Sequence, residues 1–291
     1  MSTYQIAALG RGSTRLGRLR GLIRGRCVLI VAGSVVAVTV LTAVFAPLIA
    51  PYDPNAVDPT AVYQPSSSAH WLGTDDAGRD ILSRLLYGAR SSLLAPALVT
   101  LTAGLVGTAL AVSAAWLGGW YDRLVSALLD IVFGFPGLIL AVVVAAMFGA
   151  GLTVAVVTLS VAYLPFIGRV VRSAALRERQ LPYVSALRML GVSGRRICLR
   201  HLTPNLLPLV LVQIATSYGY ALLDVAAFSF IGLGVQPPTA EWGLMVANGS
   251  TGILAGRPEQ SLYAGVVIVV FVIACNLLGG SLSQRLLGDN R

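Results

Sequence analysis

The sequence predicts an all-α polytopic membrane protein with six transmembrane helices. The 291 residues are 56% hydrophobic and only 11% charged, a composition outside the range of ordinary soluble domains. The apolar residues form long uncharged stretches, and the arginines gather on one side of a six-span topology. No low-complexity linker separates a second domain, so we expect one membrane domain.

Each predicted span is an apolar stretch that reaches or exceeds the ~20 residues a helix needs to cross a bilayer. The first and last stretches carry no charge, and residues 124–168 carry only Asp130. That long stretch is sufficient for two spans that meet near residues 149–151. The six predicted spans are residues 27–50, 92–116, 124–148, 152–172, 206–231 and 262–284.

A break is expected inside the third span. The run Gly134-Phe135-Pro136-Gly137 lies in its middle, and Pro136 has no N–H to donate to a helical ladder. We therefore expect two helical pieces there instead of one straight helix.

The net charge of +9 is explained by membrane topology and needs no nucleic-acid partner. All 21 basic residues are arginine, and 17 of them fall on one side of the six-span topology. The positive-inside rule then places the basic 1–26 tail, the 173–204 loop and the 288–291 C-terminus in the cytoplasm. Residues 51–90 and 232–261 become external loops.

Apolar residues at helical spacing in 79–87 predict an amphipathic helix along the outer membrane surface, with Asp75 or Asp76 near its N-terminus.

The 173–204 loop contains two short helical patterns. Pro182 suits the first turn of a helix, and Gly191 can end that helix with a positive φ. Ser193 can cap the second helix, which is expected to run to about Leu202, before Pro204. Two rigid helices joined by glycine would form a compact knob that transmits force from a moving partner. The alternative is an ordinary basic loop held near anionic lipid by its arginines.

This loop resembles the cytoplasmic coupling loop of ABC importer permeases. The family's pattern is Glu-Ala-Ala, three residues, Gly, nine residues, then Ile-x-Leu-Pro. With Gly191 as the anchor, Ser185-Ala186-Leu187 stands at Glu-Ala-Ala and His201-Leu202-Thr203-Pro204 at Ile-x-Leu-Pro. The Gly-to-Pro spacing is kept, whereas serine replaces the glutamate. The residues assigned to ATPase coupling are Tyr183, Ser185, Ala186, Leu187, Leu190, Gly191, Ser193, His201 and Pro204.

Two further runs look like segments of dipeptide and oligopeptide importer permeases. Leu72-Gly73-Thr74-Asp75, continuing to Arg90, is similar to their segment before the second span. Phe230-Ile231-Gly232-Leu233-Gly234, continuing to Gly243, is similar to their loop after the fifth span. The similarity covers roughly residues 27–284. It implies the type I ABC importer permease fold and the C-type member of the permease pair.

The resemblance implies a transport subunit, not an enzyme, in the plasma (inner) membrane of a prokaryote. Such a permease lies in lipid and pairs with a homologous permease. It carries two ATPase subunits on its inner face and receives a peptide from an extracytoplasmic substrate-binding protein. ATP and Mg²⁺ are expected on the ATPase subunits, with no cofactor and no metal on this chain. Related permeases with these motifs carry nickel or another small solute, which leaves a second cargo open.

The residues themselves argue against several enzyme classes. The chain has no lysine, so it lacks the side chain that a P-loop or a Schiff base requires. His70 and His201 fall on opposite sides of the predicted topology and cannot share a zinc site. Its three cysteines are expected to be free thiols. An ion-coupled secondary transporter is a further alternative, but such proteins show repeated broken helices with charge near the midplane. A non-transporting scaffold is the third.

Four residues have two interpretations each. A charge inside the membrane usually faces a cavity or a partner, so Asp130 and Asp224 are candidate translocation-path residues that meet the amino group or backbone of a peptide. Alternatively, each lies near a span end or is satisfied by a neighbouring helix. Glu241 and Trp242 are candidate contacts for the binding protein, whereas an interfacial anchor would also explain the tryptophan.

Overall fold

The computed structural model describes the backbone of residues 15–287 and the side chains of residues 27–286. Within these bounds the secondary structure is helical. The helices are α1 (Arg15–Ile49), η1 (Pro59–Ala61), α2 (Ile81–Leu117), α3 (Gly119–Gly134), α4 (Gly137–Phe148), α5 (Leu152–Glu178), α6 (Pro182–Met189), α7 (Gly194–Ile197), η2 (Cys198–Leu202), α8 (Thr203–Phe230), α9 (Trp242–Asn248), α10 (Ser250–Leu254) and α11 (Glu259–Leu287). The element η1 is a 3-10 turn and η2 is a π-helical turn.

The predicted all-α membrane fold is confirmed, with five or six candidate spans. Five helices of the described chain are long and apolar enough to cross a membrane, and α3 with α4 makes a sixth if the bent pair is one span. The two helices of that pair are bent by 91°, and Phe135 and Pro136 separate them. The expected break at Pro136 is therefore also confirmed.

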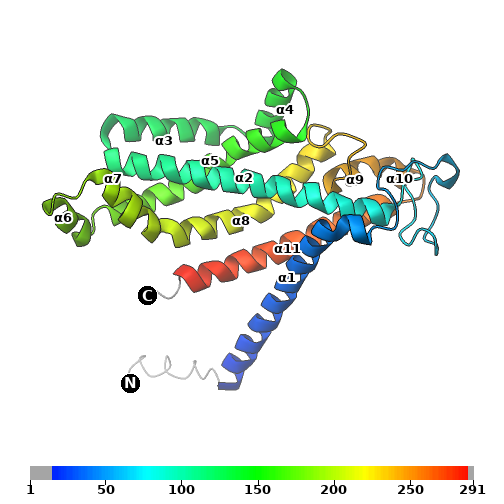
Figure 1. The fold of residues 1–291 in the computed structure, drawn as a ribbon, viewed down its shortest axis with the longest axis horizontal. Helices are drawn as coiled ribbons and strands as arrows, with labels where there is room; N and C mark the ends of the chain where they lie inside the picture. The colour runs from blue at the N-terminus through cyan, green and yellow to red at the C-terminus, as the bar shows by residue number, and fades with distance from the viewer. Residues whose placement is uncertain (1–14, 288–291) are drawn as a thin grey trace, which may run out of the picture.

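Helices α2, α5 and α8 run side by side through the middle of the molecule (Figure 1). Small buried residues form much of their contact surface, including Ala103 and Ala155. A Cβ added to Gly107 of α2 would lie 3.4 Å from the carbonyl oxygen of Leu164 on α5. Lipid is as apolar as a leucine side chain, so membrane helices associate through such close backbone approach.

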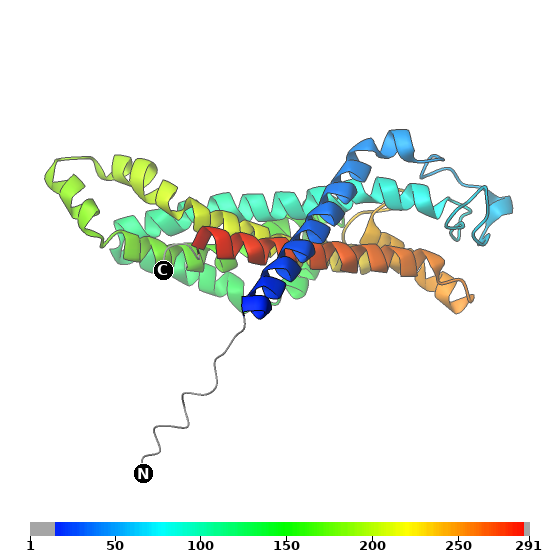
Figure 2. The ribbon, with the colours of Figure 1, turned by 90° about the horizontal axis from the view of Figure 1, so that it is seen from below.

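Helix α1 crosses α11 and packs against the beginning of α2 (Figures 1 and 2). A second apolar core lies there, with Ala43 of α1, Ile81 of α2, Trp242 of α9 and Phe271 of α11 among its buried residues. The helix begins at Arg15 and thus extends into the predicted 1–26 tail. The rest of that tail, residues 1–14, and the predicted C-terminal segment 288–291 lie outside the described residues.

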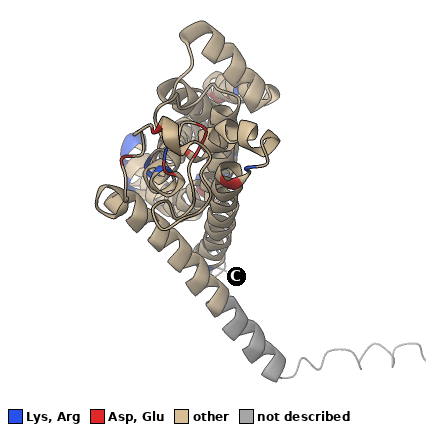
Figure 3. Cartoon of the chain, turned by 90° about the vertical axis from the view of Figure 1, so that its right-hand side faces the viewer, with Lys and Arg blue, Asp and Glu red and all other residues tan. Residues whose placement is uncertain are grey.

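The molecule has two ends with different contents. The α6 end carries α6 and α7, and the α9 end carries α9, α10 and the loop of residues 51–80 (Figure 1). Seen from the α9 end, the ribbon is mostly uncharged, and acidic and basic positions gather in the loops nearest the viewer (Figure 3). Charge therefore lies mainly at the ends of the long helices, as expected for a chain that passes through a bilayer.

The prediction of a separate amphipathic helix at residues 79–87 is wrong. Residues from Ile81 onward belong to α2, which continues without interruption for 37 residues. Such a helix is about 55 Å long, whereas the hydrocarbon core of a bilayer is about 30 Å thick. The first turns of α2 therefore project beyond the span, and the 51–80 loop covers their polar face. Arg84, expected at a membrane surface, is 0% exposed.

Ion pairs and hydrogen bonds compensate the buried charges of Arg79 and Arg84. The Arg84 Nη1 donates to the carbonyl of Pro54 over 2.9 Å, and its Nε lies 3.5 Å from Oδ2 of Asp75. The same Asp75 oxygen accepts from Nε of Arg79 over 2.7 Å. Buried charges are tolerated when they are paired and hydrogen-bonded. Asp80, not Asp75 or Asp76, caps α2, and its carboxylate accepts from the backbone N–H of Ser83 over 2.8 Å.

Candidate functional site: the α6 end and the cavity beside α8

Helix α6 ends in a glycine turn, as the sequence predicts. Gly191 has a φ of +74°, and the N–H of Val192 donates to the carbonyl of Leu187 over 3.1 Å. The N–H of Gly191 donates to the carbonyl of Arg188 over 3.0 Å. A residue in the left-handed region directly after a helix satisfies the last carbonyls in this way and turns the chain away. Pro182 occupies the first turn, as expected.

One side of α6 is anchored and the other is exposed. Val184 is 1% exposed, whereas Met189 is 83% and Leu190 is 78% exposed. Ser185 and Ala186 are also exposed. Tyr183 and Leu187 are half-buried, and Leu190 follows the last helical residue. The C-terminus of helix α6 thus presents two large apolar side chains to its surroundings.

A glutamate that the sequence reasoning missed ties three helices together. The Tyr183 hydroxyl donates to Oε1 of Glu178, at the end of α5, over 2.8 Å. The side-chain amide of Asn205, in the first turn of α8, donates to the same oxygen over 2.9 Å. Partial burial and the hydrogen bond to Glu178 raise the pKa of Tyr183 to about 12. The tyrosine therefore stays a neutral donor at physiological pH.

Trp116 at the end of α2 holds the other side of the loop. The guanidinium carbon of Arg188 lies 4.5 Å from the centre of a Trp116 ring, a cation–π contact. A Cβ on Gly194 would lie 2.7 Å from Nε1 of Trp116, so α7 approaches the indole closely. Arg179 also donates to the carbonyl of Ala115. Residues 179–202 are thus packed against α2, α5 and α8.

The second helix of the loop differs from the prediction. Ser193 stands at the N-cap of α7 and makes no side-chain capping bond to the described residues. The helix does not stop before Pro204, because α7 continues through the π-turn of η2 directly into α8. Pro204 lies in the first turn of α8, shortly after the π-turn of η2. His201 is half-buried in η2, and Pro204 is exposed.

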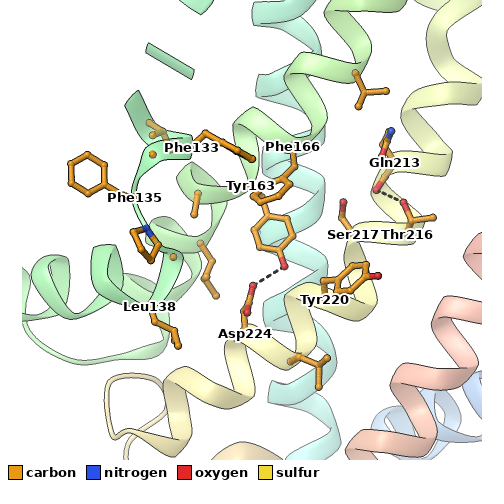
Figure 4. A pocket seen from close by; sticks show the side chains of 18 residues that line it. Phe133, Phe135, Leu138, Tyr163, Phe166, Gln213, Thr216, Ser217, Tyr220 and Asp224 are labelled. Atoms are coloured by element: carbon orange, nitrogen blue, oxygen red, sulfur yellow. Dashed lines mark hydrogen bonds between the residues drawn. The ribbon is translucent and has the colours of Figure 1, made fainter. Parts of the chain in front are cut away.

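A cavity of about 920 Å³ lies between the α3–α4 break, α5 and α8. Its polar groups come mainly from one face of α8, and Asp224 stands at one end of that face (Figure 4). The Tyr163 hydroxyl of α5 donates to Oδ2 of Asp224 over 2.8 Å. A neighbouring helix therefore satisfies one oxygen of Asp224, and the residue also lines a cavity.

Asp130 has a different environment from Asp224. Its Oδ1 accepts from Nη2 of Arg169 over 2.6 Å, and Asp130 does not line the cavity. The guanidinium of Arg169 also lies 4.1 Å above the ring of Phe133. A neighbouring helix therefore satisfies Asp130, as the second interpretation expected.

The expectation that Glu241 and Trp242 contact a binding protein is wrong for this structure. Each is only 1% exposed. The Glu241 carboxylate caps α9 by accepting from the N–H groups of Gly243 and Leu244, and Nε1 of Trp242 donates to the carbonyl of Leu85 over 3.0 Å. Burial raises the pKa of Glu241, against the opposing effect of these hydrogen bonds. Both side chains hold α9 onto α2.

Residues 104–288 match the family described as binding-protein-dependent transport system inner membrane component. The chain belongs to this family. The match includes α6 and the whole lining of the cavity, and residues 28–65 also match the N-terminal transmembrane domain of oligopeptide transport permease C. The family resemblance identified from the motifs is confirmed. The chain is a multi-pass membrane transport subunit and not an enzyme.

Several known proteins are similar to this chain over most of their length. The chain is 36% identical to the probable D,D-dipeptide transport system permease protein DdpC of Escherichia coli (strain K12), over 92% of this chain and 90% of that protein. It is 36% identical to the dipeptide transport system permease protein DppC of Alkalihalophilus pseudofirmus, over 85% and 81%. The glutathione transport system permease protein GsiD of Pectobacterium atrosepticum is also 36% identical, over 89% and 86%.

A solved structure shows the same fold. The chain aligns with a chain of the MetNI methionine ABC transporter in an inward-facing conformation, with a TM-score of 0.54 and 21% identity. The alignment covers 71% of this chain and 97% of that one. The type I importer permease architecture predicted for this sequence is therefore present.

Proposed function

We propose that the chain is one of two permease subunits in an ATP-driven importer that moves peptides across the plasma membrane. The three relatives above are named for the transport of dipeptides or of glutathione, which supports a peptidic cargo. The partners are a homologous permease, two ATPase subunits that hold ATP and Mg²⁺, and an extracytoplasmic substrate-binding protein.

The observation that carries the coupling role is the exposed apolar end of α6. Met189 and Leu190 are 83% and 78% exposed, although Arg179 and Tyr183 tie the same segment to α2, α5 and α8. An anchored helix with a free apolar tip suits insertion into a cleft of a moving ATPase. The displacement would pass through Glu178 to α5 and through the continuous α7–η2–α8 helix into the membrane. The pathway would then alternate between outward and inward openings.

The orientation in this proposal follows from charge. The α6 end carries most of the arginines of the described chain, and the positive-inside rule places such a region in the cytoplasm. The α9 end then faces outward, where a binding protein delivers cargo. Both termini are cytoplasmic in this arrangement.

A paired substitution tests the docking surface. Burying a leucine or methionine side chain contributes about 1.5–3 kcal/mol, so Met189→Asp with Leu190→Asp is expected to weaken ATPase association at least about tenfold. The measurement is copurification of ATPase subunits with the permease pair, together with uptake of a labelled dipeptide into proteoliposomes. Leu254→Asp is the matched control, since Leu254 is 91% exposed on α10 at the opposite end.

Full ATPase retention by the doubly substituted chain would contradict a docking role for α6. Uptake of nickel ions without uptake of any dipeptide would support an importer role for the chain but show that its cargo is nickel and not a peptide. Transport by this chain alone, without ATPase subunits, would favour an ion-coupled transporter.

A further inference from the structure

The cavity beside α8 has one acidic group in its lining. Of the described residues that line it, Asp224 is acidic and none is basic. Its other polar groups are neutral amides and hydroxyls, and its remaining wall is aromatic and aliphatic. The cavity is therefore a space inside a membrane domain whose lining has one acidic group and no basic group to pair with it.

Asp224 retains unused acceptor capacity. Its Oδ2 accepts one hydrogen bond from Tyr163 over 2.8 Å, whereas Oδ1 accepts none from the described part of the chain. An ionised carboxylate offers about four acceptor positions. Because a charge at membrane depth is costly unless it meets a partner, the open side of this carboxylate indicates a cationic partner from outside the chain (Figure 4).

Aromatic rings line the cavity, and one of them, Tyr163, is hydrogen-bonded to this carboxylate. Tyr163 and Phe166 have ring centres 5.7 Å apart, and Phe133 lies against Phe166 with a centre-to-centre distance of 5.2 Å. Tyr220 on α8 lines the opposite side and is 62% exposed. One face of Phe133 already holds the guanidinium of Arg169. Aromatic faces attract ammonium groups more strongly when water is displaced, so Tyr163 and Tyr220 favour the same kind of ligand as the carboxylate.

A stripe of neutral polar side chains extends from Asp224 along α8. Gln213, Ser217 and Tyr220 lie on the cavity face with it, at helical spacing. From residue 213 to residue 224 the stripe is about 16 Å long at 1.5 Å per residue. A chain of amides lying along the stripe could exchange hydrogen bonds with these groups while its charged end met the carboxylate.

We propose that this cavity holds a subsite for the ammonium group of a peptide, with Asp224 as its counter-ion and the α8 stripe beside the peptide backbone. This inference rests on the proposed function, because it names the chemical group that the pathway recognises. A cavity of about 920 Å³ has the size of sites that enclose small organic ligands. A divalent metal ion suits it less well, since the lining supplies one carboxylate and no histidine or cysteine.

A protection experiment tests the subsite without relying on the binding protein. In the assembled transporter, with Cys27, Cys198 and Cys275 replaced by alanine, Leu223→Cys places a thiol in the cavity lining. The rate of thiol labelling is measured with alanyl-alanine and with N-acetylalanyl-alanine, which lacks the ammonium group. The free peptide is expected to protect the thiol at concentrations about tenfold lower, the effect of one charge-assisted hydrogen bond.

Asp224→Asn is expected to abolish this difference, and Asp224→Glu to keep it. Asp130→Asn is the matched control, because Asp130 is also an acidic residue of a membrane helix but pairs with Arg169 outside the cavity. It should retain the preference for the free peptide. Copurification of all subunits with each variant shows that assembly is intact.

Three results would overturn the subsite. The first is equal protection by the two peptides, and the second is a preference for the free peptide that survives in Asp224→Asn. The third is that no peptide protects the thiol in the parent complex while Asp224→Asn loses the second permease. That result would show that a basic residue of the partner permease is the counter-ion of Asp224. Dipeptide uptake by the parent complex is measured in parallel. Uptake without the preference refutes only the subsite, whereas no uptake of any peptide refutes the proposed function.

Discussion

At the scale of single residues, Gly191 determines how the chain leaves α6. Its φ of +74° lies in the left-handed region, and a Cβ built there would meet nothing within 4 Å. The need for glycine is therefore conformational and not steric. The same position is where the sequence pattern placed its anchor, so local backbone chemistry and the proposed docking surface coincide.

Gly191→Val is expected to strain this turn by roughly 1–3 kcal/mol, because β-branched residues avoid positive φ. The strain would disturb Met189 and Leu190 and leave the cavity beside α8 unchanged. We expect weaker ATPase association, or ATP hydrolysis uncoupled from uptake, in a chain that still inserts. ATPase copurification and dipeptide uptake in proteoliposomes measure both effects.

Two substitutions serve as controls for that prediction. Gly191→Asn should retain most coupling, because asparagine adopts the left-handed region more readily than other residues with a side chain. Ser185→Ala should have little effect, since Ser185 is exposed and uncharged. Wild-type uptake with full ATPase retention in Gly191→Val would remove the main support for a rigid coupling turn.

At the scale of elements, the beginning of α2 shows why burial can reverse an interpretation based on periodicity. Residues 79–87 have the alternating faces of an interfacial helix, but the 51–80 loop folds over the polar face and pairs its charges. The loop and helix are joined by Asp75, which is 0% exposed and contacts both Arg79 and Arg84.

Asp75→Asn is expected to lower the free energy of unfolding by about 3–5 kcal/mol, because it leaves buried arginine charge without its counter-ion. Asp76→Asn is the matched control at the next position. The Asp76 side chain is 41% exposed and lies 3.3 Å from Arg79, so its removal should cost about 1 kcal/mol or less. Thermal unfolding in detergent and protease sensitivity of the 51–80 loop measure the difference. Equal effects of the two substitutions would show that the buried pairs do not hold the loop.

At the scale of the whole molecule, the arginines divide between the two ends. Arg79, Arg84, Arg90 and Arg257 lie toward the α9 end, and the arginines between residues 169 and 200 lie toward the α6 end. The arginines at the two ends also differ in how far they are buried. At the α9 end Arg84 is fully buried, whereas at the α6 end Arg195, Arg196 and Arg200 are exposed. Exposed arginine favours the side with the negative cytoplasmic leaflet.

Cysteine labelling tests this orientation in intact cells. In a chain with its native cysteines replaced, Ser193→Cys is expected to react only after the membrane is permeabilised. Ser67→Cys should react with the same impermeant reagent from outside. Both serines are exposed and they lie at opposite ends of the molecule, so each serves as the control for the other. Outside labelling of Ser193→Cys would invert the topology.

Sequence information alone was sufficient for the features that depend on local chemistry or on composition. The long apolar stretches predicted six spans, Pro136 predicted the break between α3 and α4, and Gly191 predicted a positive-φ turn. The spans follow from the thickness of the bilayer, the break from the missing N–H of proline, and the turn from the missing Cβ of glycine. None of these causes depends on tertiary contacts.

The tertiary structure decided everything that depends on which surface covers a side chain. Asp130 and Asp224 look alike in the sequence, but Arg169 neutralises the first and a cavity opens beside the second. Arg84 and Glu241 were expected at accessible surfaces, and both are buried because distant segments supply their partners. Periodicity reports the faces of one helix. Burial is set by contacts between residues as far apart as Ser92 and Glu241, and no local pattern encodes those.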